Sequence, residues 1–459
     1  MKETAATLSP PGAARIDDAH GTGTLDTVLS EDAEKKLISR VTWRLVPLIF
    51  VAWFINYLDR ANIGFAALQM NQELGMGPEM FGFAAGIFYL GYILFEVPSN
   101  MLMHRFGAST WLARIMFTWG IVSVGMAFVQ TPQQLYAARL LLGIVEAGFF
   151  PSVLYYLALW FPARHLGKAI SQVYSANIVS LIIGSPISAL IISHFHEKGG
   201  FSGWRWMMIL EGAPAILLGV IAFFYMVNRP SEARWLSPAE RNWLVRTMAS
   251  EQASAAAKGS ATFRKALTAP MVWLLGLLYC CIGIGFFGVS TWLPQVIRQL
   301  TDLSIMEIGF VSAIPFILGA IAMIANARHS DRTMERRWHL TGSLIVGTAG
   351  LAASGLTSSM PLVSFTFICI AAAGIVGSLS VFWTIPPTFL AGAGAAGGMA
   401  LINAISGLAG FFAPWLVGVA RARTHDFTLA LYGLALSVAV AVLLAAFLPY
   451  AKAQGPRAD

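Results

Sequence analysis

The sequence contains little charge for its length. Of its 459 residues, 12% are Asp, Glu, Lys or Arg, whereas 57% are hydrophobic. A typical soluble domain carries about 25% charged residues, so this composition excludes an ordinary soluble fold. It predicts an all-helical integral membrane protein that has the lipid bilayer as its solvent and principal partner.

Cysteine is also scarce. Cys280, Cys281 and Cys369 lie inside apolar stretches and lack metal-ligand spacing. We therefore expect packed thiols, with neither a disulfide framework nor a metal site. The sequence shows no phosphate-binding loop, nucleophile motif or clustered histidines, so we expect neither enzymatic activity nor a cofactor.

The net charge of +7 does not indicate nucleic-acid binding. That activity requires basic residues gathered on one folded face, whereas here they form short blocks between apolar stretches. Such blocks are typical of cytoplasmic connections in membrane proteins. Residues 1–40 lack the apolar core of a secretory signal and are predicted to form a disordered cytoplasmic tail.

Long apolar stretches define the predicted architecture. A helix of about 20 residues crosses a hydrocarbon core of about 30 Å. The stretches that meet this requirement are 44–66, 80–103, 108–129, 133–156, 168–192, 204–228, 270–297, 305–327, 338–358, 361–384, 395–420 and 427–450. We therefore predict twelve transmembrane helices.

One long polar connection divides these helices six plus six. The predicted domains are an amino-terminal bundle, a cytoplasmic linker, a carboxyl-terminal bundle and a short cytoplasmic tail, at 41–228, 229–269, 270–450 and 451–459. Lys and Arg concentrate in the amino-terminal tail, the linker and alternate connections, which predicts that both termini are cytoplasmic. Asn177 precedes Gly184 by the interval that separates Asn403 from Gly410, and this similarity favours internally repeated halves.

Four charged residues lie where charge is costly. Asp59 and Arg60 fall in the first predicted span, and Arg139 and Glu146 fall in the fourth. A charge at the centre of a membrane helix costs about 2.5–3.5 kcal/mol on insertion scales. Such residues are typical of a substrate or ion pathway.

Helix geometry constrains how these four side chains are arranged. Arg139 and Glu146, seven residues apart, share one helix face, and the helix rise places Arg60 and Arg139 at similar depths in the outer half of the membrane. Asp59 and Arg60 are about 100° apart around their helix. We expect one of them to face a cavity and the other to face a neighbouring helix.

The side-chain types suggest how the pathway works. Arginine stays protonated and offers a planar fork of donors that matches a carboxylate, so Arg60 predicts an anionic substrate. Asp59 and Glu146 are candidate proton carriers. Burial raises the pKa of a carboxyl group and a nearby arginine lowers it, so protonation can respond to whether the arginine is occupied. A permanent interhelical salt bridge is the alternative, and for Glu96 and Glu211 we favour structural pairing.

Several motifs together resemble the major facilitator superfamily, in particular its anion:cation symporter family, over about residues 40–450. The matching segments are Asn56–Gly64, Arg139–Gly143 with Glu146, Gly148 and Pro151, Gly203–Trp206 with Glu211 and Gly212, and Asn403 with Gly407, Gly410 and Pro414. The resemblance implies two six-helix bundles around a central site.

The same resemblance implies roles for individual residues. Arg60 is expected to bind a substrate carboxylate, Asp59 and Glu146 to take up protons, and Arg139 to link protonation to binding. Further residues expected to line the central site are Tyr57, Tyr92, Gln172, Ser380, Trp383 and Asn403. Phe382 replaces a small polar side chain expected in sugar-acid carriers, which suggests a less hydroxylated or aromatic acid unless Phe382 belongs to the core.

A loop motif of the superfamily is recognisable after the eighth span. It comprises Ser330, Asp331, Arg332, Glu335, Arg336 and Arg337. The earlier copy is reduced to His104–Gly107, in which Arg105 remains but the usual Asp is missing. The resemblance implies that Arg105, Asp331, Arg332, Arg336 and Arg337 contribute to a conformational latch.

These observations predict a proton-coupled symporter that imports a small organic carboxylate by alternating access. The substrate classes considered are sugar acids, hydroxy-dicarboxylates and aromatic acids, with protons as the coupling ion. We expect a monomer in a bacterial-type cytoplasmic (inner) membrane. Two alternatives are an exporter of amphipathic drugs with the same fold and a non-transporting membrane sensor of an organic anion.

Overall fold

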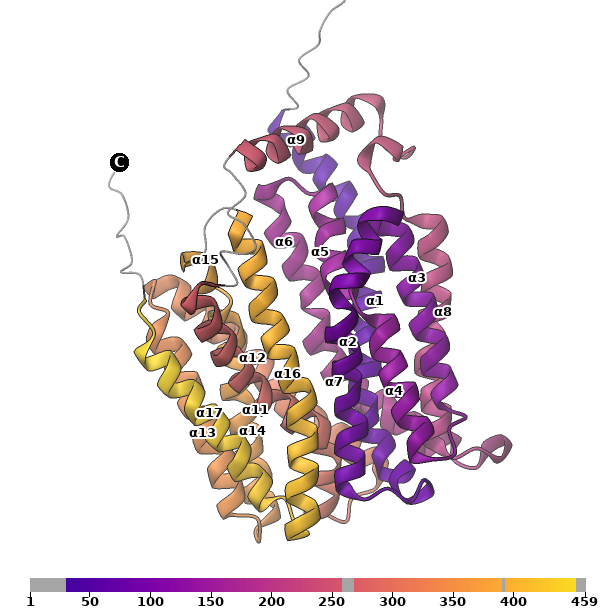
Figure 1. Cartoon of the computed structure of the whole chain (residues 1–459), viewed down its shortest axis with the longest axis vertical. Helices are drawn as coiled ribbons and strands as arrows, with labels where there is room; N and C mark the ends of the chain where they lie inside the picture. Colours follow the sequence, from indigo (N-terminus) through magenta and orange to yellow (C-terminus); the bar gives the residue numbers. More distant parts are fainter. Residues whose placement is uncertain (1–29, 258–267, 390–392, 451–459) are drawn as a thin grey trace, which may run out of the picture.

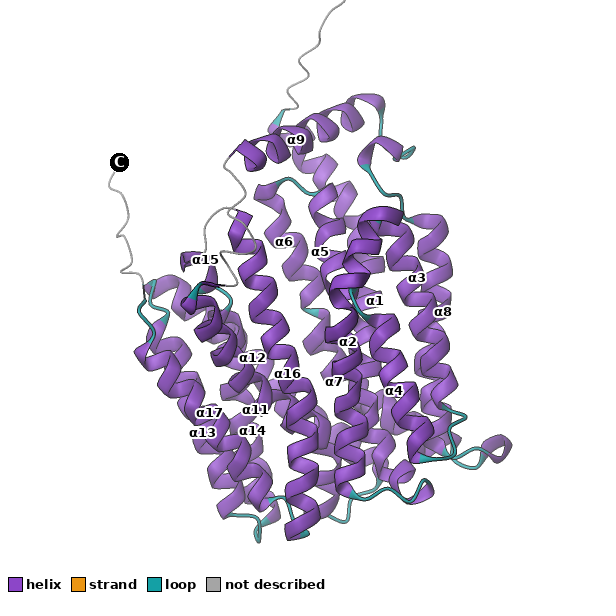
Figure 2. Cartoon of the chain, viewed as in Figure 1, coloured by secondary structure: helices purple, strands orange, loops and turns teal. Residues whose placement is uncertain are grey.

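Helix is the regular secondary structure found throughout residues 30–257, 268–389 and 393–450, which are the residues described by the computed structural model (Figure 2). Helices satisfy their backbone hydrogen bonds within one segment, as the interior of a bilayer requires. Ten helical segments are long and apolar enough to cross a membrane. Two more helices, α3 (Ala108–Met126) and α13 (Arg337–Leu356), pack beside spanning helices and complete the predicted twelve.

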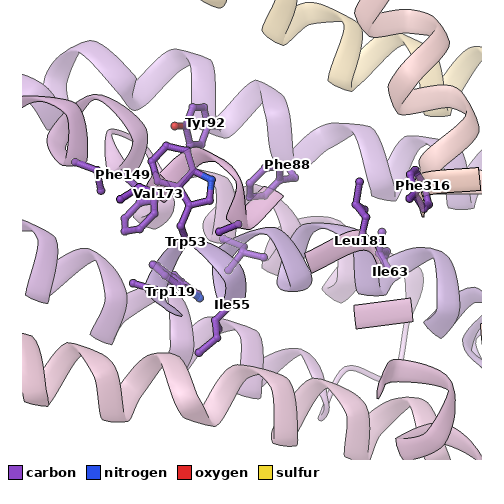
Figure 3. Close-up of a cluster of buried hydrophobic side chains, with 14 of the residues drawn as sticks. Trp53, Ile55, Ile63, Phe88, Tyr92, Trp119, Phe149, Val173, Leu181 and Phe316 are labelled. Atoms are coloured by element: carbon purple, nitrogen blue, oxygen red, sulfur yellow. The ribbon is translucent and has the colours of Figure 1, made fainter. Parts of the chain in front are cut away.

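The amino-terminal half is a helical bundle around a large apolar core. Its other helices are α1 (Glu31–Glu73), α2 (Pro78–Phe106), α4 (Pro132–Glu146), α5 (Phe149–Trp160), α6 (Ala163–Tyr174), α7 (Ala176–Phe195) and α8 (Gly203–Tyr225). Figure 3 shows part of the core, in which Trp53 of α1 lies near Phe149. The Phe149 ring also packs edge-on against Trp119, with ring centroids 5.2 Å apart.

The fourth predicted span is interrupted near its middle. Helix α4 ends at Glu146, and α5 begins at Phe149. Between them, Ala147 is extended and Gly148 adopts a φ of 84°, a conformation that favours glycine. The break places the Glu146 carboxylate at a helix carboxyl terminus, where the helix dipole does not stabilise a negative charge.

The carboxyl-terminal half repeats the helical plan. Its other helices are α11 (Pro270–Leu300), α12 (Ile305–Thr333), α14 (Pro361–Phe382), α15 (Pro386–Phe389), α16 (Ala393–Thr424) and α17 (Thr428–Phe447). Helix α2 packs against α16, and α7 packs against α12. The second span thus packs against the eleventh and the fifth against the eighth, so each contact becomes the other when the two halves are exchanged, as expected for repeated halves.

The amino-terminal tail predicted for residues 1–40 is wrong for residues 31–40, which form the first turns of α1. The Ser30 side chain caps this helix by accepting a hydrogen bond from the Ala33 backbone N–H. Glu34 then forms an ion pair with Arg164 and a hydrogen bond with His165, both of α6. Capping and tertiary contacts thus extend the helix beyond its apolar part, while residues 1–29 and 451–459 lie outside the described residues.

Helix α9 (Pro238–Ala257) occupies much of the predicted linker and lies across one end of the amino-terminal half (Figure 1). Its Glu240 accepts a hydrogen bond from Arg40 of α1 at 2.8 Å, and Glu251 accepts one from the Ala163 backbone at 3.0 Å. Linker residues 258–267 lie outside the described part of the chain. We refer to this end of the molecule as the α9 end.

The two halves pack closely at the opposite end. A Cβ at Gly64 of α1 would lie 2.6 Å from the Thr291 carbonyl oxygen of α11, and a Cβ at Gly418 of α16 would lie 2.5 Å from the Pro78 carbonyl oxygen of α2. Glycine is required at these positions because the backbones approach so closely. The structure is therefore closed between the halves at the end far from α9.

Candidate functional site

A buried ion pair joins α1 to α4 in the amino-terminal half. The Arg60 Nε donates to Glu146 Oε1 at 2.6 Å, and Arg60 Nη2 contacts the same oxygen. The Glu146 side chain is fully buried, whereas 17% of the Arg60 side chain is exposed. Glu146 Oε2 is buried and has no hydrogen-bond partner, so the only polar partner this carboxylate has within the described chain is Arg60.

The second arginine lies beside the first but is not ion-paired in the described structure. Both guanidinium groups lie over the Phe88 ring, whose centroid is 5.2 Å from Cζ of Arg60 and 5.0 Å from Cζ of Arg139. Arg139 is buried and donates to the carbonyl oxygens of Ala84 and Ala85 at 3.4 and 3.3 Å. Both arginines therefore contact the same ring, whereas their common depth in the membrane stays a prediction.

Tyr92 forms another wall of this site. Its ring centroid lies 4.8 Å from Cζ of Arg60, so this largely buried cation contacts two aromatic rings, Tyr92 and Phe88. Glu96 follows one turn later on α2, half-buried and within electrostatic reach of Arg60. Burial between aromatic rings strengthens every charge interaction that Arg60 makes.

Asp59 points away from Arg60, as their angular separation on α1 predicts. The Asp59 side chain is fully buried and accepts hydrogen bonds from Ser123 Oγ at 2.5 Å and from Asn62 Nδ2 at 3.1 Å. Asp59 therefore faces α3, while Arg60 faces α4. The two predicted proton carriers, Asp59 and Glu146, occupy different polar environments.

Glu211, for which structural pairing was expected, lies among neutral hydrogen-bond partners. It is buried, and its carboxylate accepts hydrogen bonds from Ser188 Oγ at 2.7 Å and Asn62 Nδ2 at 3.1 Å. No cationic group lies within 4.0 Å of it in the described residues. The structural pairing expected for Glu211 is therefore made with neutral hydrogen-bond donors.

The carboxyl-terminal half contributes aromatic groups rather than charges. Trp383 Nε1 donates to the Tyr279 hydroxyl at 3.2 Å, and the Tyr279 ring stacks on Phe382 with centroids 4.6 Å apart. Tyr279 also lies within electrostatic reach of Tyr174 of the amino-terminal half. Tyr279 was not predicted as a site residue, although a tyrosine inside an apolar span is a signal that would have identified it.

Phe382 is a core residue in this structure. It has no exposed surface, and its ring is covered by the stacked ring of Tyr279. Phe382 therefore belongs to the core rather than to the lining of a substrate site, and it provides no evidence about the substrate. Its aromatic neighbours Tyr279 and Trp383 are only partly buried.

The remaining predicted lining residues are dispersed. Tyr57 lies within electrostatic reach of Arg60 and Tyr174. Ser380 Oγ donates to the Met323 carbonyl oxygen at 3.4 Å, and Asn403 is half-buried on α16. The structure thus brings Tyr57 and Tyr92 to Arg60, but it shows no contact between Arg60 and either Ser380 or Asn403.

Gln172 lines a cavity of about 640 Å³ towards the α9 end, together with Lys35 and Thr42 of α1 and Lys168 of α6. Thr42 and Arg60 are separated by 18 residues, which is about five helical turns. They therefore project from the same side of α1. The cavity lies along the side of α1 that leads from the α9 end towards Arg60.

The carboxyl-terminal copy of the loop motif is internally bonded. Asp331 pairs with Arg336 at 2.6 Å, and Arg337 donates to the Ala446 carbonyl oxygen of α17. Burial alone would raise the pKa of Glu335, but hydrogen bonds from Trp338 and His339 outweigh it, so this pKa is lowered. The motif ties the end of α12 to α13.

The other two members of the predicted latch have fewer interactions. Arg332 is exposed at the end of α12. Arg105, in the reduced copy, lies over the Phe106 ring at 5.7 Å. No interaction between Arg105 and the other four residues is seen in this conformation, so the latch stays a prediction.

Comparison with known proteins identifies the family. The sequence is 44% identical over 428 residues to a putative tartrate transporter of Agrobacterium vitis, covering 92% of this chain and 94% of that protein. It is 35% identical to a quinolone resistance transporter of Acinetobacter baumannii, covering 92% and 96% of the two chains.

The fold also matches a solved structure. An inward-facing, unoccupied bacterial homologue of the human lysosomal transporter Spinster superposes with a TM-score of 0.73 at 16% identity, over 90% of this chain and 96% of that one. The profile described as Major Facilitator Superfamily matches residues 49–414. The chain therefore belongs to the Major Facilitator Superfamily and is a membrane transporter, not an enzyme.

Proposed function

We propose that this protein is a proton-coupled symporter that imports a small organic carboxylate. The buried Arg60–Glu146 ion pair carries the proposal. A guanidinium suited to a substrate carboxylate is occupied by a carboxylate of the protein itself, which has no other polar partner in the described chain. Substrate and Glu146 therefore compete for one cation.

Protonation decides this competition. A proton on Glu146 removes its charge and leaves the largely buried Arg60 without its ion-pair partner, which is an unfavourable state. A substrate carboxylate restores the pairing. Protonation of Glu146 thus favours binding of the substrate anion to Arg60, and anion binding favours protonation. This mutual dependence is the basis of symport.

The relatives and the site favour a hydroxy-dicarboxylate such as tartrate. A relative with 44% identity is named a putative tartrate transporter. Arg60 and Arg139 both contact the Phe88 ring, so a second cation lies near the one proposed to bind the first carboxylate. Tyr279 and Trp383 provide hydroxyl and indole groups on the opposite half.

The charge distribution supports an orientation in the inner membrane. The α9 end carries Lys35, Arg40, Arg164 and Lys168, and positive residues favour the cytoplasmic side. Both termini are then cytoplasmic, and the closed contact at Gly64 faces the periplasm. We propose that a monomer alternates between this state and one that is closed at the α9 end.

Export of an amphipathic drug is the second candidate. It is favoured by the 35% identity to a quinolone resistance transporter. The buried Arg139 and the largely buried Arg60 favour anions over the cations that many drug exporters accept. Expression in a drug-sensitive host separates these functions, because an exporter lowers susceptibility whereas an organic-acid importer does not.

Transport by purified protein in liposomes tests the proposal. An inside-alkaline pH gradient should drive uptake of labelled tartrate, with an aldonic acid and benzoate as comparison substrates, and a protonophore should abolish it. Two protons with a monoanion would carry net charge, for which the membrane potential contributes about 2.3 kcal/mol per charge per 100 mV. Tartrate binding without flux would instead support the sensor, and flux that ignores the gradient would refute proton coupling.

A further inference from the structure

A second polar cluster lies close to the Arg60–Glu146 pair, on the other side of α1. Asn62 Nδ2 donates to Asp59 Oδ1 at 3.1 Å and to Glu211 Oε2 at 3.1 Å. Ser123 Oγ adds a hydrogen bond to Asp59, and Ser188 Oγ adds one to Glu211. One amide group thus bridges two carboxyl groups at the junction of α1, α3, α7 and α8.

The bridged carboxyl groups are shielded from solvent. Asp59 is 0% exposed and Glu211 is 3% exposed. Within the described residues, no lysine, arginine or histidine lies within 4.0 Å of either carboxyl group, since the ion pairs of α1 and α8 involve other acids. The neighbouring charged groups are Arg139 and Glu146, which act on Asp59 from α4.

Full ionisation of this cluster is energetically unfavourable. An isolated charge in an apolar interior costs far more than a neutral polar group, and two carboxylates that share one site do not both ionise readily. The hydrogen-bond inventory leads to the same conclusion, because Asp59 Oδ2 and Asn62 Oδ1 are buried acceptors without a donor. A carboxylic acid proton is a donor of the kind that this cluster lacks.

We propose that Glu211 is a proton-binding residue that acts with Asp59, through Asn62, as a single coupled proton site distinct from the Arg60–Glu146 pair. The site holds at least one proton near neutral pH, and its two carboxyl groups titrate as a pair. Its part in symport rests on the proposed function above, whereas its protonation does not. Because Asp59 lies within electrostatic reach of Glu146 and Arg139 on α4, the charge of this site acts on the Arg60–Glu146 pair through Glu146.

Infrared spectroscopy of the purified full-length protein tests this inference without transport. The carbonyl stretch of a protonated carboxylic acid is resolved from that of a carboxylate, and its intensity is followed as pH is raised. Relative to wild type, the Asp59→Asn/Glu211→Gln double variant should lose two titration steps and each single variant should lose one. Glu31→Gln, a change at a carboxylate that is 93% exposed, is the control and should leave the acid band at neutral pH unchanged.

Two conservative variants keep the test decisive if Glu211→Gln folds poorly. Ser188→Ala removes one hydrogen bond to Glu211 and should shift the frequency of its acid band, while Ser123→Ala should do the same for Asp59. Unchanged acid bands in both serine variants, or a wild-type titration in Glu211→Gln, would overturn the proposed site.

Transport measurements then separate this inference from the proposed function. In liposomes, Glu211→Gln should retain exchange of substrate across the membrane but accumulate less substrate under a pH gradient. Wild-type accumulation by Glu211→Gln would remove Glu211 from coupling. Wild-type protein that shows the paired titration but no gradient-driven uptake would instead refute symport and leave the proton site intact.

Discussion

The two halves of this transporter share a helical plan but differ in the chemistry of their interiors. The amino-terminal half buries Asp59, Arg139, Glu146 and Glu211, whereas the described spans of the other half bury hydroxyl, amide and aromatic groups. Burying a charged side chain costs free energy, so ionisable residues inside membrane spans usually mark a substrate pathway or a proton relay. We infer a division of labour in which the first half couples protons to binding and the second half shapes the substrate site.

The strongest test of this division is the removal of the charge at position 146. Glu146→Gln keeps the shape of the side chain but fixes it in the neutral form, so Arg60 no longer has a competing carboxylate. We expect complete loss of pH-driven accumulation, with exchange of labelled for unlabelled substrate retained. Normal accumulation by this variant in liposomes would exclude Glu146 as a proton carrier.

A substitution at Arg60 tests whether the amino-terminal half recognises a carboxylate by the shape of the guanidinium group as well as by its charge. Arg60→Lys retains a cation but loses the fork that contacts a carboxylate. A hydrogen bond to a charged group contributes about 1.5–3 kcal/mol, so substrate affinity should fall roughly 10- to 100-fold. Calorimetric titration with tartrate measures this loss, and an unchanged Kd would argue against carboxylate recognition by Arg60.

The contact between the halves is open to a separate test. In Gly64→Ala the new methyl group would lie 2.6 Å from the Thr291 carbonyl oxygen, and overpacking of this kind typically costs about 1–3 kcal/mol. We expect the population closed at this end to fall, as reported by labelling of a cysteine introduced nearby. Gly433→Ala is the matched control, since its Cβ meets nothing within 4 Å, and equal labelling of the two variants would contradict the predicted contact.

The smallest expected effect concerns the aromatic half. Tyr279→Phe keeps the ring that stacks on Phe382 but removes the hydroxyl that binds Trp383. A neutral hydrogen bond contributes about 0.5–1.5 kcal/mol, so affinity should fall roughly 2- to 10-fold while the pH dependence of uptake stays constant. An altered pH dependence of uptake would show that the carboxyl-terminal half takes part in proton coupling, which would contradict the inferred division of labour.

The sequence predicted the membrane class and the division into two bundles, because both depend on local hydrophobicity and chain length. It also identified the residues of the Arg60–Glu146 pair, since charges in apolar spans stand out. It did not predict the interruption after Glu146, because Ala147 and Gly148 occur in an otherwise continuous apolar stretch. Residues 31–40 were misjudged because their helix depends on a cap and on contacts with α6.

The sequence by itself determined that the protein lies in a bilayer, which charged residues fall inside apolar spans, and in which half those residues lie. Tertiary structure decided the partners, pairing Arg60 with Glu146, connecting Asp59 to Glu211 through Asn62, and stacking Tyr279 on Phe382. Hydrophobicity is a property of each segment, whereas the choice of partner depends on how packed helices are rotated relative to one another.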